Sequence, residues 1–144
     1  MNNFLICVFA LLCATAYAGT RIPLTSEERT MLKSKLEECQ SDPNTKIPRE
    51  ISENLQHGKW PEDEQLFAGL LCFAIKTDMM SENGDLNIPH IKEAWGRHYP
   101  DDIKNLEACM VQKENPKRTA YHLLKCKQNV VGVSNDALNV LNSH

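Results

Sequence analysis

Apolar residues recur at helical spacing along most of the chain, and short polar segments rich in proline, glycine and asparagine separate these stretches. No stretch of useful length alternates apolar and polar residues as a half-buried β-strand would. The pattern therefore predicts an all-α fold, a compact bundle of six or seven short helices. They are expected to begin near Thr25, Pro48, Pro61, Asn87, Pro100, Lys117 and Ser134.

The residues at the expected helix starts support these boundaries. Thr25 and Glu28 have the spacing of a capping box. Pro61 is followed by three acidic residues in the expected first turn of its helix, where the helix dipole favours negative charge. Asn87 is expected to cap the next helix. Between residues 66 and 75 the apolar residues surround the helix axis, which is typical of a central, buried helix.

The first eighteen residues have the features of an export signal. An apolar run extends from Phe4 to Ala14, and the segment Ala16-Tyr17-Ala18 supplies the small residues of a cleavage site. The run is shorter than the ~20 apolar residues that a membrane-spanning helix needs, and no later stretch approaches that length. We therefore expect residues 1–18 to be removed as a signal peptide, residues 19–144 to form one secreted domain, and no transmembrane segment.

The chain contains six cysteines, of which Cys7 and Cys13 fall in the expected signal peptide. The four that remain are Cys39, Cys72, Cys109 and Cys126. An even number in a small exported chain favours two disulfides, and the residues alone leave three pairings open. The alternative is a metal site, but none of the four belongs to a C-x-x-C pair. His122 lies one helical turn from Cys126, which is weak support for zinc.

Charge and motifs argue against several classes of function. The chain has 16 basic and 19 acidic side chains and no long basic run, so nucleic acid is not an expected partner. The five histidines are scattered and no hydrolase or zinc-protease motif occurs, so we do not expect an enzyme. The loop between residues 78 and 87 fails as a calcium site, because Met79 and His90 stand where oxygen ligands are needed. No metal or cofactor is expected.

The abundance of apolar side chains in short helices leaves two interpretations open. In the first, these side chains fill an ordinary core, whose close packing leaves few voids. In the second, they surround a cavity that accepts an apolar ligand. Composition alone favours the filled core.

The spacing of the four remaining cysteines changes this weighting. The chain resembles the insect odorant-binding proteins, including the pheromone- and general-odorant-binding groups, whose usual pattern has six cysteines. The four match the first, third, fourth and sixth of that pattern. The second would fall at Ala68 and the fifth at Lys117, and in the family these two bond to each other. Loss of one complete bridge is typical of the subgroup with four cysteines.

The resemblance implies the bridges Cys39–Cys72 and Cys109–Cys126, with the helices arranged around an internal apolar cavity. It also implies reversible carriage of small hydrophobic molecules such as odorants or pheromones through extracellular fluid, either sensillum lymph or haemolymph. An olfactory receptor and a second copy of the chain are the candidate protein partners. From the inward helix faces and the family's helix arrangement we expect eight residues, called the wall residues below, to bind the ligand. They are Leu55, Leu70, Phe73, Ile91, Trp95, Met110, Tyr121 and Leu124.

Two side chains carry finer hypotheses. Tyr121 is placed to hydrogen-bond an alcohol, aldehyde or ester oxygen of a ligand, unless its hydroxyl lies in solvent. His98 shares a helix face with Trp95, so its protonation would open the wall, unless it is an exposed histidine at a helix end. Two other functions stay open: a haemolymph lipid carrier, and a secreted interaction or defence protein without a ligand cavity.

Overall fold

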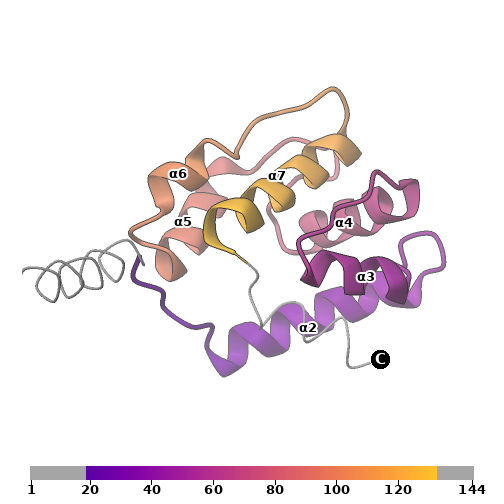
Figure 1. Cartoon of the computed structure of the whole chain (residues 1–144), viewed down its shortest axis with the longest axis horizontal. Coiled ribbons are helices and arrows are strands. Elements are labelled where there is room, and N and C mark those ends of the chain that lie inside the picture. Colours follow the sequence, from indigo (N-terminus) through magenta and orange to yellow (C-terminus); the bar gives the residue numbers. More distant parts are fainter. Residues whose placement is uncertain (1–18, 133–144) are drawn as a thin grey trace, which may run out of the picture.

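The computed structural model describes residues 19–132, and this part of the chain forms six helices (Figure 1). They are α2 (Ser26–Ser41), α3 (Arg49–Gln56), α4 (Glu64–Lys76), α5 (Ile88–His98), α6 (Ile103–Glu107) and α7 (Pro116–Val131). The only β-type pairing among residues 19–132 is one isolated antiparallel bridge between Met80 and Leu86. The predicted all-α fold is confirmed. The expected signal peptide and the helix expected after Ser134 lie outside the described residues.

Helices α4 and α7 make the most extensive contact between any two helices, and they lie side by side in Figure 1. Helix α2 packs against α4, and α6 contacts both α5 and α7. Within α4, Leu66, Phe67 and Leu70 are buried, whereas Phe73 and Ile75 are partly buried against the same core. The helix that is apolar on all sides is therefore the central one, as its sequence predicts.

The capping box expected at the first helix is present. Thr25 is the N-cap residue of α2, and its Oγ1 accepts a hydrogen bond of 3.1 Å from the backbone N–H of Glu28. The Glu28 carboxylate in turn accepts one of 2.9 Å from the N–H of Thr25. Two backbone donors that would otherwise lack partners are thereby satisfied, which fixes the start of the helix.

One predicted helix start and one predicted side-chain cap differ from the structure. Helix α4 begins at Glu64 rather than at Pro61, because the Asp63 side chain accepts a hydrogen bond of 3.0 Å from the Leu66 N–H and takes the N-cap position. A carboxylate there satisfies a first-turn donor directly. Asn87 does precede α5, but its side chain makes no capping hydrogen bond.

The helix expected from Pro100 is much shorter than its apolar pattern suggests. Helix α6 spans five residues, Ile103–Glu107, and no side-chain cap starts it. Met110 is nevertheless buried, in the irregular segment that follows the helix. Met110 is therefore buried as its spacing predicts, although α6 ends before it.

Gly69 lets a loop approach α4 closely. A Cβ atom at this position would lie only 2.8 Å from the backbone carbonyl oxygen of Thr45, and it would also collide with the side chain of Ile47. Glycine in a helix interior costs about 1 kcal/mol relative to alanine. Here the missing side chain allows the segment between α2 and α3 to pack directly on the central helix.

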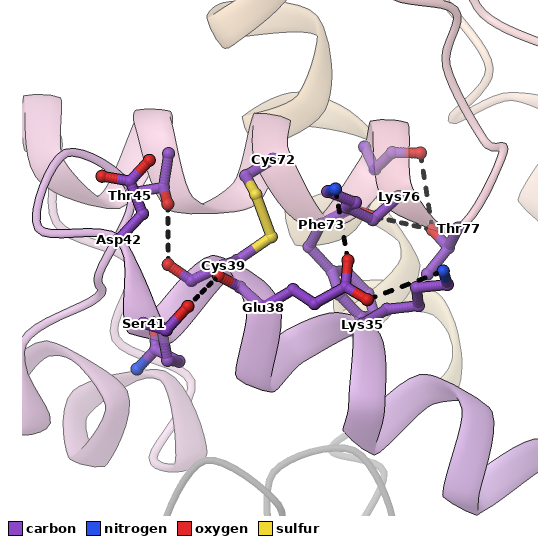
Figure 2. Close-up of a disulfide and its surroundings, with 12 residues drawn as sticks. Lys35, Glu38, Cys39, Ser41, Asp42, Thr45, Cys72, Phe73, Lys76 and Thr77 are labelled. Atoms are coloured by element: carbon purple, nitrogen blue, oxygen red, sulfur yellow. Dashed lines mark hydrogen bonds and ion pairs between the residues drawn. A yellow bond between two sulfur atoms is a disulfide. The ribbon is translucent and has the colours of Figure 1, made fainter.

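Two disulfides link the helices. Cys39 of α2 is bonded to Cys72 of α4 with their Cα atoms 6.0 Å apart, and Figure 2 shows this bridge. Cys109 is bonded to Cys126 of α7 with a Cα separation of 5.5 Å. Both separations are usual for a disulfide. The pairing implied by the resemblance is confirmed.

Candidate functional site

The structure brings all eight wall residues into one hydrophobic cluster. Phe73 and Leu124 are partly buried and pack against the buried core of this cluster. The other six are buried members of it: Leu55, Leu70, Ile91, Trp95, Met110 and Tyr121. They come from α3, α4, α5 and α7 and from the segment after α6. These positions thus form a shared apolar interior, and their contact with a ligand stays a prediction.

A hydrogen-bonded group beside this interior, here called the Trp60 cluster, consists of Trp60, Tyr121, Gln128 and the Leu55 carbonyl. The Tyr121 hydroxyl donates to the backbone carbonyl of Trp60 at 2.8 Å. The Trp60 indole N–H donates to the Gln128 side-chain oxygen, and the Gln128 amide N–H donates to the Leu55 carbonyl at 2.9 Å. The cluster therefore joins the segment before α4 and the end of α3 to α7.

This arrangement changes the expectation for Tyr121. Its ring makes edge-on contacts with Trp60 and Phe67, with ring centres 5.8 and 4.9 Å apart. Because its hydroxyl proton is donated to a backbone carbonyl, the hydroxyl offers a ligand only its oxygen lone pairs. It could accept from an alcohol, but the observed hydrogen bond leaves no proton for an aldehyde or ester oxygen. The alternative, a hydroxyl that lies in solvent, is wrong, because the hydroxyl is bonded to the Trp60 carbonyl; a contact between Tyr121 and a ligand stays a prediction.

On α7, next to Gln128 in the sequence, a lysine lies among aromatic rings, a feature that the sequence pattern did not predict. The Lys127 ammonium is 5.5 Å from the ring centre of Trp95 and 5.3 Å from that of Tyr99. Lys127 follows Leu124 by three residues on α7, so both lie on one helix face. This spacing could have predicted the inward position of Lys127 from the sequence, because Leu124 was expected to face the interior.

His98 is not part of the wall. Its Nε2 lies 3.3 Å from the Glu28 carboxylate, its Nδ1 lies 2.8 Å from the Ile22 carbonyl oxygen, and its side chain is only 12% exposed. The pKa of the Glu28 carboxyl is lowered, chiefly by the hydrogen bond from the Thr25 N–H and then by the charges of His98 and Arg97. Both ring nitrogens face acceptor oxygens, and only a protonated ring can donate from both nitrogens. Protonation would thus tighten the contact instead of opening the wall, and the exposed alternative is wrong.

A solvent-open hollow of about 300 Å³ lies over the N-terminal ends of α4 and α7. Its lining residues are Glu64, Phe67, Leu71, Asn115, Pro116, Lys117 and Arg118. Lys117, at the position of the family's fifth cysteine, forms an ion pair of 3.5 Å with Glu64. None of the wall residues lines this hollow, which is therefore distinct from the expected ligand site.

Between residues 19 and 132, no group of three or more histidine, cysteine, aspartate or glutamate side chains is arranged to hold a metal ion. Over the same residues, none of the helices has the length and apolar character needed to cross a bilayer.

The sequence was also compared with known proteins. The model of the PBP/GOBP family matches residues 23–129, a stretch that begins just before α2 and ends near the end of α7. No curated protein and no solved structure matches the chain. The family match covers well over half of the 144 residues and contains both disulfides and all eight wall residues. The chain therefore belongs to the PBP/GOBP family, the insect odorant- and pheromone-binding proteins.

Proposed function

We propose that this protein is an extracellular carrier that reversibly binds small hydrophobic molecules among the apolar side chains of its interior. The family to which the chain belongs binds small apolar ligands, and its members are secreted. Two disulfides fit an oxidising, extracellular environment. The observation that carries the proposal is the gathering of all eight wall residues, from distant parts of the sequence, in a single hydrophobic cluster.

Apolar transfer is the proposed source of affinity. Each buried CH₂ group contributes ~0.8 kcal/mol, so a ligand of ten to fifteen carbons gains on the order of 10 kcal/mol before costs. Loss of ligand motion and ordering of side chains remove several kcal/mol of this, which leaves affinities of roughly micromolar strength. Such affinity suits a carrier, because the ligand has to be released as well as bound.

The test uses the mature protein, residues 19–144, and the neutral fluorescent dye N-phenyl-1-naphthylamine. We expect the dye to bind with increased fluorescence and 1-dodecanol to displace it competitively. Leu124→Trp adds bulk to a partly buried wall position and is expected to weaken dye binding by ~10-fold or more, since overpacking removes ligand space. Val111→Trp is the matched control, because Val111 is 43% exposed and lies outside the cluster.

Two outcomes would contradict the proposal. Failure of the wild-type protein to bind the dye or 1-dodecanol would argue for a secreted protein that acts through its surface. Equal weakening by Leu124→Trp and Val111→Trp would show that the dye binds somewhere other than among the wall residues. Circular dichroism of each variant checks that the helices are retained.

A further inference from the structure

We propose that Lys127 is the counter-charge for an anionic ligand head group, so that the preferred ligands are long-chain carboxylic acids rather than neutral odorants. This inference rests on the proposed carrier function and specifies its class of ligand. It is carried by the place of Lys127 in the fold, by the groups around it and by the difference between Lys127 and other lysines of the chain.

The place of Lys127 on α7 is an inward one. Ala120, Leu124, Lys127 and Val131 follow one another at intervals of four, three and four residues, which puts them on one face of the helix. Ala120 and Val131 are buried in the hydrophobic cluster, and Leu124 packs against it. An ammonium group on this stripe emerges among apolar side chains, in a position where most proteins place a leucine or a methionine.

Among residues 19–132, the groups around Lys127 favour a cation but do not neutralise it. The Lys127 ammonium lies 5.5 Å from the ring centre of Trp95 and 5.3 Å from that of Tyr99. The π faces of these rings attract a cation weakly. A second cation, the guanidinium of Arg21, lies 5.9 Å from the centre of the same Tyr99 ring. Two positive groups thus converge on one ring, and among residues 19–132 no carboxylate forms an ion pair with Lys127. Two cations near one aromatic ring, together with the apolar side chains of this helix face, suit an anionic amphiphile.

Burial has a measurable electrostatic consequence at this position. The pKa of Lys127 is lowered to about 8, because removal from water disfavours the charged form. That value still exceeds neutral pH, so most of the protein carries a charged, partly buried ammonium. A buried charge that lacks a partner is costly, and an entering carboxylate relieves this cost with a charge-assisted hydrogen bond.

Other lysines of the helices differ from Lys127 in having carboxylate partners. Lys76 pairs with Glu38 at 3.2 Å, and Lys92 pairs with Glu107 at 3.7 Å. Lys125 is the nearest match to Lys127, since it lies on the same helix and its ammonium is 5.4 Å from the centre of the Tyr121 ring. Lys125 therefore provides the control for the effects of removing a positive charge and a cation–π contact from this helix.

The experiment compares two ligands with the same alkyl chain. Isothermal titration calorimetry at pH 7 measures binding of dodecanoate and of 1-dodecanol to mature wild-type protein and to three variants. Lys127→Met keeps the apolar stem and removes the charge, and we expect it to weaken dodecanoate binding by ~10- to 100-fold, the usual value of a hydrogen bond to a charged group. Affinity for 1-dodecanol should change by no more than ~3-fold, because its tail makes the same contacts.

The remaining variants separate a head-group contact from a structural role. Lys127→Arg keeps the positive charge and should retain the preference for dodecanoate over 1-dodecanol. Lys125→Met makes the same change in net charge and should bind both ligands as the wild-type protein does. Retained binding of 1-dodecanol by Lys127→Met also shows that this variant is folded.

The outcomes that overturn the inference differ from those that overturn the carrier function. Unchanged dodecanoate binding by Lys127→Met, or loss of the acid preference in Lys125→Met alone, would refute the anionic site while 1-dodecanol binding preserved the carrier function. Absence of binding of both ligands to the wild-type protein would refute both proposals.

Discussion

The central helix α4 is attached to its two neighbours in different ways. On the α2 side a disulfide joins Cys39 to Cys72, and the Lys76 ammonium lies 3.2 Å from the Glu38 carboxylate beside it (Figure 2). A covalent bond and an ion pair thus act at one place. This contact is less extensive than the contact between α4 and α7.

The α7 side has apolar packing and charges but no covalent bond. Here Lys117 pairs with Glu64 at 3.5 Å, and Arg118 pairs with Glu62 at 3.0 Å while its guanidinium lies 4.6 Å from the ring centre of Phe67. We call this set of contacts the α4–α7 seam. The family's usual third bridge would join Ala68 to Lys117 along it.

The difference shows where a helical fold can do without a disulfide. By the assignment that the resemblance implies, the absent bridge would fall at the most extensive helix contact of the described chain, where buried apolar area already holds α4 and α7 together. The bridge that is present supports the smaller contact. Covalent and apolar stabilisation therefore complement each other in this protein, and variants at the two sides of α4 should have unequal effects.

The largest effect is expected from removal of the Cys39–Cys72 bridge. The two cysteines are 33 residues apart in sequence, and the loop-entropy estimate gives a loss of ~4 kcal/mol in the free energy of unfolding for Cys39→Ala with Cys72→Ala. Urea unfolding followed by circular dichroism measures it. The matched control removes Cys109–Cys126, whose separation of 17 residues gives a smaller loss of ~3 kcal/mol. A larger loss in the control would contradict the comparison.

The next effect is a gain, obtained by restoring the third bridge. We expect Ala68→Cys with Lys117→Cys to form a disulfide without added reagents. It should raise the free energy of unfolding by less than the ~4 kcal/mol of the loop-entropy estimate, because an engineered bridge commonly strains the native geometry. Ala68 lies one turn after Glu64, whose carboxylate already contacts the Lys117 ammonium. Thiol titration and urea unfolding check the two parts of this prediction. Two free thiols in the folded double variant would show that the assignment of the missing cysteines is wrong, and Ala68→Cys alone is the control.

The sequence predicted those features that depend on near neighbours along the chain. Helical spacing of apolar residues identified the helices, and the pair Thr25 and Glu28 identified the first helix start to within a residue. The start of α4 was misplaced because Pro61 is also a favourable first residue, whereas the Asp63 side chain forms the actual cap. The disulfide pairing followed from the resemblance to a family, because four cysteines by themselves allow three pairings.

Features that depend on distant segments escaped prediction. His98 lies on the same helix as Trp95, but the segment before α2 folds back on it, and the Ile22 N–H donates to the His98 carbonyl at 2.9 Å. Helical periodicity on α5 contains no information about that segment. Lys127 was overlooked because charged residues are usually assigned to the solvent face, and only the approach of α5 puts aromatic rings around its ammonium.

A smaller effect than either disulfide change is expected from Glu28→Gln, which tests an ion pair in a more enclosed place than the seam. The pKa of Glu28 is lowered in the folded protein, mainly by the Thr25 N–H and then by His98 and Arg97. Its stabilisation is therefore present above the ordinary glutamate value of 4.5 and is lost as the pH falls through the lowered pKa. Thermal melts should show the variant less stable than the wild type at neutral pH, with the difference vanishing in acid. A difference that persisted in acid would mean that the Glu28 charge is not its cause.

The smallest effect is expected at the seam itself. Lys117→Gln removes an ion pair whose side chains are 46% and 81% exposed, and such pairs contribute ~0–1 kcal/mol because water and salt screen them. Arg118→Gln should cost more in the same urea titration, because it also uncovers the Phe67 ring. A high-salt repeat should reduce the Lys117→Gln effect further. If Lys117→Gln instead lowered the free energy of unfolding as much as loss of a disulfide, the ion pair rather than apolar packing would replace the missing bridge. The two sides of α4 would then differ only in whether a covalent bond or an ion pair stabilises them.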